Sequence, residues 1–123
     1  MGIKSFEEYL NDILILKLKG SRTLYDTDEI NTLLISSLEK SEYGKVIIDF
    51  SEVRGKRSII DSVRRAESFP LRFHKYKIAL IEATENREVA VAEESVFNNR
   101  GFILRAFFDI NDGIDWLKSL NNH

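Results

Sequence analysis

The sequence contains no cysteine, and this absence excludes several kinds of chemistry. Without cysteine, the chain has no disulfide bond, no thiolate nucleophile and no cysteine-based zinc or iron–sulfur site. It has a single proline, and it lacks the Gly-x-Gly-x-x-Gly and Walker sequences that bind phosphates. We therefore expect a cytoplasmic protein with no cofactor and no metal site.

Long apolar runs and an excess of one charge are also missing. The 123 residues include 18 Lys and Arg against 20 Asp and Glu, a formal net charge of −2, which argues against a protein that coats nucleic acid. No apolar stretch approaches membrane-spanning length, and the first residues do not resemble a signal peptide. What is present, 43% hydrophobic and 31% charged residues, is typical of one globular domain over residues 1–123. We expect no nucleic-acid partner and no membrane insertion.

The first third of the chain predicts a hairpin followed by a helix. Residues 13–19 alternate, with Leu14, Leu16 and Leu18 on one face and Ile13, Ile15, Lys17 and Lys19 on the other. The extended segment 3–9 is expected to pair with this strand, antiparallel, through a turn at Asn11-Asp12. Asp26 is expected to cap a helix that Gly44 ends.

The rest of the chain alternates between strands and helices. Continuous apolar runs predict buried strands at 46–50 and 77–81, and a last strand at 102–108. Ser58 is expected to cap a helix that Pro70 ends, with Ile59, Ile60, Val63 and Ala66 inward. A further helix is predicted over 86–99, where Gly101 closes it. The last helix is predicted to start at Asn111 or Asp112. Right-handed crossovers then require an α/β fold, in which helices flank a mixed sheet that is parallel except at the N-terminal hairpin.

Three motifs near the C-terminus resemble a known family. They are Asn98-Asn99-Arg100-Gly101-Phe102, Ala106-Phe107-Phe108-Asp109 and Gly113-Ile114-Asp115-Trp116-Leu117. In this order and spacing they look like the C-terminal pattern of the SpoIIAA-like proteins, which are related to the STAS domains of sporulation anti-sigma-factor antagonists and similar in outline to CRAL-TRIO domains. The strands at 13–20, 46–51 and 78–81 fit the same family, so the resemblance covers nearly the whole chain.

The resemblance implies a bacterial-type regulatory binding module and no enzyme. In STAS relatives that switch partners, a serine that starts a helix after a central strand is phosphorylated to release the partner. This sequence has Lys56-Arg57-Ser58-Ile59 where the family has Asp-Ser-Ser-Gly. Ser58 is therefore the candidate phosphoacceptor.

Basic residues gather in the middle of the chain. Residues 54–77 hold eight basic side chains against the acidic Asp61 and Glu67. Arg54, Lys56 and Arg57 follow a central strand and precede the N-terminus of the Ser58 helix, where open α/β sheets bind ligands and anions are favoured. Arg54, Lys56, Arg57 and Ser58 are therefore the candidate site for an anion or an acidic protein partner. The alternative is that the basic side chains form a solvated surface paired with acidic helices.

Three further features have alternative interpretations. Phe69, Leu71, Phe73 and Tyr76 could form the lip of an apolar ligand pocket or pack in the core. Asp49 is predicted to bond backbone N–H groups, and a general base is the alternative. Trp116 is predicted to dock the last helix on the sheet, whereas an exposed Trp116 would indicate a homodimer or partner contact.

Together these features favour a non-enzymatic regulatory or protein-interaction module. The alternative is a carrier of a small apolar or phosphorylated ligand.

Overall fold

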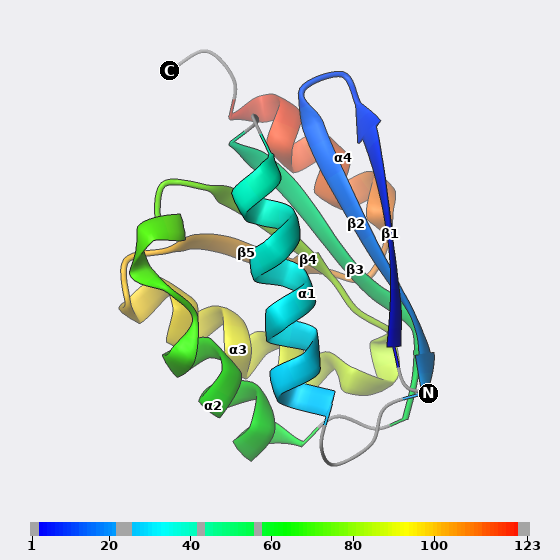
Figure 1. The fold of residues 1–123 in the computed structure, drawn as a ribbon, viewed down its shortest axis with the longest axis vertical. Helices are drawn as coiled ribbons and strands as arrows, with labels where there is room; N and C mark the ends of the chain where they lie inside the picture. Colours follow the sequence, from blue (N-terminus) through cyan, green and yellow to red (C-terminus); the bar gives the residue numbers. More distant parts are fainter. Residues whose placement is uncertain (1–2, 22–25, 42–43, 56–57, 121–123) are drawn as a thin grey trace.

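The computed structural model of the protein describes residues 3–21, 26–41, 44–55 and 58–120. Within these ranges the chain forms five strands, four α-helices and two short 3-10 helices (Figure 1). In chain order they are β1 (Ile3–Leu10), β2 (Ile13–Ser21), α1 (Asp26–Lys40), β3 (Lys45–Arg54), α2 (Ile59–Ser68), η1 (Leu71–Phe73), β4 (Lys77–Ile81), η2 (Thr84–Asn86), α3 (Arg87–Asn99), β5 (Ile103–Phe107) and α4 (Ile110–Ser119).

The five strands form one mixed sheet in the order β1-β2-β3-β4-β5. β1 and β2 pair antiparallel, and each later neighbour pairs parallel. Asn11 closes the hairpin with a φ of 54°, in the left-handed region that Asn tolerates better than most residues. The predicted α/β fold with a single antiparallel hairpin is confirmed.

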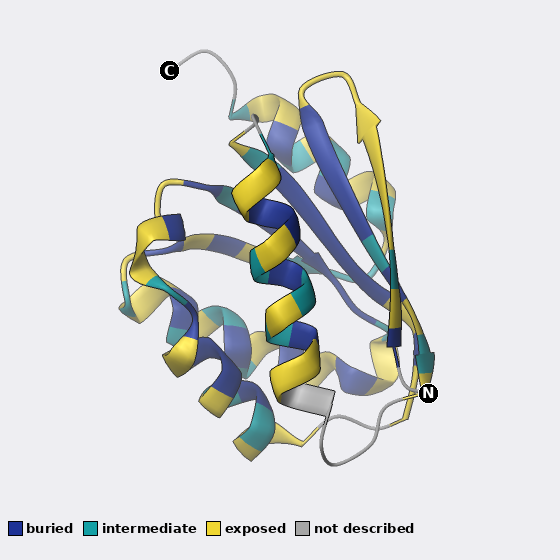
Figure 2. Cartoon of the chain, in the orientation of Figure 1, coloured by how far each residue is buried: buried dark blue, intermediate teal, exposed yellow. Residues whose placement is uncertain are grey.

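The sheet separates two hydrophobic cores. On one face, Val46, Ile48 and Phe50 of β3 join buried residues of α1, α2 and α3. On the other face, Ile13, Ile15 and Ile47 join Leu117 of α4. Figure 2 shows the buried centre of the sheet and the largely exposed edge strand β1. The run of apolar residues in β3 follows from this arrangement, because successive side chains enter opposite cores.

An extra residue in β3 changes which face its last side chains occupy. Lys17 pairs with Asp49, but Lys19 pairs with Glu52, so the register shifts by one residue between them. Ile48 lies in the core beneath α1 to α3 before the shift, and Val53 does so after it. Because alternate residues face opposite sides, Glu52 and Arg54 fall on the face that α4 partly covers.

Asp49 stabilises this register shift. Its side chain is 3% exposed, and Oδ1 accepts a hydrogen bond from the Ser51 backbone N–H at 2.8 Å. An N–H group at an irregular point of a strand would otherwise lack a partner. This is the backbone hydrogen bond that the sequence predicts for Asp49.

α2 presents a different face to the core from the one predicted. Ser62, Arg65 and Ala66 are buried, whereas Ile59 is 49% and Ile60 68% exposed. The prediction is correct for Ala66, correct in part for the half-buried Val63, and wrong for Ile59 and Ile60.

The reason for this orientation is a buried ion pair between α2 and α3. The Arg65 guanidinium bonds the Glu93 carboxylate of α3 and lies 4.8 Å from the centre of the Phe50 ring. Turning the two isoleucines inward would expose this ion pair and leave the Phe50 contact unmade.

Two further predictions of helix ends are corrected. α1 ends at Lys40, and Gly44 instead directly precedes β3, where its carbonyl accepts from the Lys77 N–H at 2.8 Å. α4 begins at Ile110 because Asp109 caps it, accepting from the Asn111 N–H at 2.8 Å. Gly101 closes α3 with a φ of 92°, as predicted.

α4 docks on the sheet through residues of unequal burial. Leu117 is fully buried, and the half-buried Trp116 ring lies 5.7 Å from that of Phe107 on β5. Gly113 makes the closest approach: a Cβ added there would lie 2.9 Å from Ile81 Cδ1 and 3.2 Å from Ala79 Cβ. Trp116 therefore docks the last helix, as predicted, and Leu117 and Gly113 set its distance from the sheet.

Candidate functional site

Two of the four predicted site residues lie in the described ranges, at the carboxyl end of β3. Arg54 is the exposed last residue of that strand. Ser58 is exposed and caps α2, its hydroxyl accepting from the Asp61 N–H at 3.3 Å. The predicted cap is thus confirmed. Lys56 and Arg57 lie outside the described residues.

The other basic residues of segment 54–77 do not all share one solvated surface. Arg65 is buried against Glu93, and Arg72 pairs with Glu39 of α1. Arg64 Nη1 lies 3.6 Å from Asp61 Oδ1 within α2 itself. These ion pairs reduce the free positive charge that the sequence predicts for this segment.

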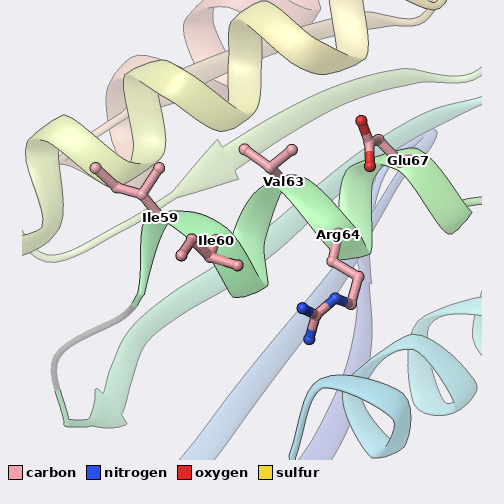
Figure 3. Close-up of a pocket in the computed structure, with 5 residues that line it drawn as sticks. All are labelled: Ile59, Ile60, Val63, Arg64 and Glu67. Atoms are coloured by element: carbon pink, nitrogen blue, oxygen red, sulfur yellow. The ribbon is translucent and has the colours of Figure 1, made fainter.

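α2 carries an exposed apolar surface that the sequence did not predict. Ile59, Ile60 and Val63 line a shallow groove of about 310 Å³ with Arg64 and Glu67, and Figure 3 shows these five side chains projecting from the helix. The groove directly follows Ser58. We call the surface formed by these five residues the α2 face. Its exposure depends on the partner that Arg65 finds on α3, so the local sequence pattern could not reveal it.

A second pocket, of about 580 Å³, lies where β1, β2 and β3 run side by side. It is lined by Lys4, Phe6, Lys19, Gly20, Glu52 and Arg54. We call it the sheet pocket. The sequence had placed Lys17 and Lys19 on one strand face, but only the strand pairing brings Lys4 opposite Lys19 and Phe6 opposite Lys17.

Glu52 is held beside the sheet pocket by two lysines. Its carboxylate lies 3.2 Å from Lys17 Nζ and 3.7 Å from Lys19 Nζ. The hydrogen bond from Lys17 holds the pKa of Glu52 below its usual value, and the charges of both lysines add to the effect. The same hydrogen bond raises the pKa of Lys17.

Three of the four residues of the predicted apolar lip are buried. Phe69, Phe73 and Tyr76 are 2%, 3% and 8% exposed, and their rings form edge and tilted contacts with one another and with Phe97 and Phe102. Leu71 is 57% exposed. Neither the α2 groove nor the sheet pocket includes any of the four. This arrangement favours core packing, the alternative that the sequence left open.

Within the described ranges, a metal-binding cluster and a membrane-spanning helix are both absent. No three His, Asp or Glu side chains lie together in a way that could hold a metal ion. No helix among those residues combines the length and the apolar character needed to span a bilayer.

Known proteins resemble this chain in structure more clearly than in sequence. No protein-family model matches it, and no curated protein matches it significantly. An anti-sigma factor antagonist from Mycobacterium paratuberculosis is 8% identical and superposes with a TM-score of 0.67 over 95% of each chain. An uncharacterised DUF3478 protein from Shewanella loihica, described as having a SpoIIAA-like fold, is 24% identical, with a TM-score of 0.58 over 94% of this chain and 93% of that one.

The fold is SpoIIAA-like. A Ser-to-Glu variant of RsbS from Moorella thermoacetica has the same architecture, with 16% identity and a TM-score of 0.63 over 95% of this chain and 97% of that one. The C-terminal motifs had predicted this fold, and the comparison confirms it. With identities below a quarter, the likeness to these proteins concerns the fold.

Proposed function

We propose that this protein is a non-enzymatic, cytoplasmic regulatory module that binds an acidic protein partner through Arg54, Lys56, Arg57, Ser58 and the α2 face. The main support is the exposure of Ile59 and Ile60 at the start of α2, directly after the capping serine. The Mycobacterium paratuberculosis protein of similar fold, which is named as an anti-sigma factor antagonist, adds support for a regulatory role.

The chemistry of this surface indicates the kind of partner it fits. Exposed apolar side chains such as Ile59 and Ile60 lose unfavourable water contact when a partner covers them. Arg64 and Glu67 flank them in the groove, and in the sequence the basic residues Arg54, Lys56 and Arg57 precede them. A partner with an apolar centre and acidic residues around it would complement both features.

A matched pair of substitutions tests the α2 face. Ile60→Glu places a charge at the centre of the proposed interface, while Ile103→Glu makes the same change on β5, at the amino end of the sheet, where Ile103 is 44% exposed. Partners captured by the wild type are identified by mass spectrometry and their affinities measured by calorimetry. We expect Ile60→Glu to weaken binding at least tenfold and Ile103→Glu to leave it unchanged. Equal affinities for the two variants would contradict the proposal.

Phosphorylation of Ser58 would regulate the same interface. A phosphate there would place a dianion before α2, where it repels an acidic partner. Ser58→Asp mimics part of this charge, and Ser58→Asn is its neutral control, since Asp and Asn both cap helices well. We expect Ser58→Asp to weaken partner binding and Ser58→Asn to preserve it, with similar melting temperatures. Equal partner affinities for the two variants would argue against charge control at Ser58.

A further inference from the structure

The sheet pocket lies beyond the part of the sheet that α4 covers. α4 packs on Ile13, Ile15 and Ile47, which lie towards the amino ends of β2 and β3. Further along the same face, β2 continues with Lys17 and Lys19. The change from isoleucine to lysine on one strand face coincides with the end of the α4 contact. The pocket is thus a polar part of this sheet face that α4 leaves uncovered.

Within the described ranges, two cations at the pocket have no ion-pair partner. The Glu52 carboxylate forms ion pairs with Lys17 and Lys19. Among the residues that the structure describes, no carboxylate lies within ion-pair distance of Lys4 or Arg54. Both line the pocket. A protein with a net charge of −2 therefore has a local positive site here, suited to a ligand with two negative charges.

Phe6 adds an apolar surface to this positive site. Its side chain is 51% exposed, and on β1 it lies opposite Lys17 and two residues from Lys4. The pocket volume of about 580 Å³ is within the range of small-molecule sites, which combine an apolar surface with a few polar groups. A flat ring on the ligand would cover the exposed Phe6 ring.

The register shift of β3 positions one of the two cations. Without the extra residue, Arg54 would point to the face beneath α1, where Val53 now lies. Asp49 holds the shift through the Ser51 N–H. The fold thus places Arg54 from β3 beside Lys4 from β1, although fifty positions separate them in the sequence.

We propose that the sheet pocket binds a small organic phosphate monoester, with the phosphate dianion at Lys4 and Arg54 and a flat ring against Phe6. Both cations are suited to phosphate, Arg as a planar donor of paired hydrogen bonds and Lys as a point charge. The site lies on the sheet rather than on α2. Apart from Arg54, it shares no residue with the proposed partner surface.

The test uses three probes that separate charge from ring: phenyl phosphate, inorganic phosphate and phenol. Each is titrated into the full chain and followed by amide NMR shifts. We expect phenyl phosphate to bind more tightly than inorganic phosphate, with saturable shifts around Lys4, Phe6, Lys19 and Arg54, and phenol to cause no saturable shift.

Variants then assign the contacts. Lys4→Gln and Arg54→Gln should each weaken phenyl phosphate about tenfold, as the loss of a hydrogen bond to a charged group predicts. Phe6→Ala should reduce phenyl phosphate affinity to that of inorganic phosphate. The control is Lys118→Gln, which makes the same charge change at an exposed position of α4. It should leave the affinity for phenyl phosphate unchanged.

Two results would overturn the proposal. One is unchanged phenyl phosphate affinity in Lys4→Gln, and the other is equal affinity of the wild type for phenyl phosphate and inorganic phosphate. Ile60→Glu separates this site from the partner surface, because it should weaken the protein partner and leave phenyl phosphate binding intact.

Discussion

At the scale of single residues, Gly113 shows how a sequence position can be fixed by a neighbour far along the chain. In an exposed helix, replacing Gly by Ala stabilises by about 1 kcal/mol. Here the added methyl group would meet Ala79 Cβ and the buried Ile81 side chain on β4. Overpacking of this kind costs about 1–3 kcal/mol. The contact should therefore outweigh the gain in helix propensity.

We accordingly expect Gly113→Ala to lower the free energy of unfolding, measured by urea denaturation. Asp115→Ala, at an exposed position of the same helix, is the control and should stay within about 0.5 kcal/mol of the wild type. A Gly113→Ala protein as stable as the wild type or more so would show that the sheet yields to the methyl group.

Glu52 offers a second prediction at this scale, since its pKa depends chiefly on one neighbour. The hydrogen bond from Lys17 is the largest cause of its lowered pKa, ahead of the charges of Lys17 and Lys19. Lys17→Met should raise the Glu52 pKa towards its usual value, and Lys19→Met should raise it less. Carbon-detected NMR titration of the Glu52 carboxyl measures both. Equal changes of the Glu52 pKa in the two variants would contradict the leading role of the Lys17 hydrogen bond.

The sign of the accompanying stability effect follows from the lowered pKa. Because the folded state holds the Glu52 carboxyl ionised at lower pH than the unfolded chain does, the ion pair contributes stability above the usual glutamate pKa. This contribution is lost as the pH falls through the folded-state pKa. The pair is exposed and the effect small, so the titration itself is the better measurement.

At the scale of elements, the contact between α2 and α3 determines which surface is available for binding. Arg65 and Glu93 are 4% and 1% exposed, and they join helices that are far apart in the sequence. Removing one partner of a buried ion pair leaves a charge without compensation, which costs about 3–5 kcal/mol. The orientation of α2 should depend on this pair.

We therefore expect Glu93→Gln to destabilise the protein by about 3–5 kcal/mol in chemical denaturation. The double variant Arg65→Met with Glu93→Leu removes both charges and should recover much of that loss. A second measurement follows Ile60: if the ion pair sets the orientation of α2, solvent protection of the Ile60 methyl groups should rise in Glu93→Gln. Loss of less than about 1 kcal/mol in the single variant would show that other contacts hold the two helices together.

The same contact shows what the sequence could and could not predict. Strands such as Val46–Phe50 and helix caps such as Ser58 and Gly101 are local patterns, and these predictions are confirmed. The inward face of α2 was predicted to hold Ile59, Ile60, Val63 and Ala66. Of these four, Ala66 is buried and the two isoleucines are exposed, because a non-local ion pair sets the orientation of the helix. The predicted hairpin with its turn at Asn11-Asp12 does bring Lys4 opposite Lys19. The extra residue in β3, which adds Arg54 to the same face, has no local signature, so the sheet pocket was missed.

At the scale of the whole molecule, the charge is unevenly distributed over a nearly neutral chain. Arg54 lies at the carboxyl end of the central strand, next to the Lys56-Arg57 sequence and Ser58. Much of the remaining basic charge of segment 54–77 is paired with acidic groups of α1, α2 and α3. The attraction of an acidic protein should therefore depend mainly on Arg54, Lys56 and Arg57.

Reversal of two of these charges tests this dependence. Arg54→Glu combined with Arg57→Glu should abolish capture of the acidic partner and leave the melting temperature nearly unchanged, because exposed charges contribute little to stability. Raising the salt concentration should weaken wild-type binding in the same direction, since charges in solvent are screened over about 10 Å at 0.1 M ionic strength. Reversal of Arg72 and Lys75 to Glu, which leaves the net charge of the chain the same as in the first variant, is the control. If both double variants lose the partner equally, overall charge and not the carboxyl end of β3 attracts it; if neither does, the contact depends on the apolar α2 face alone.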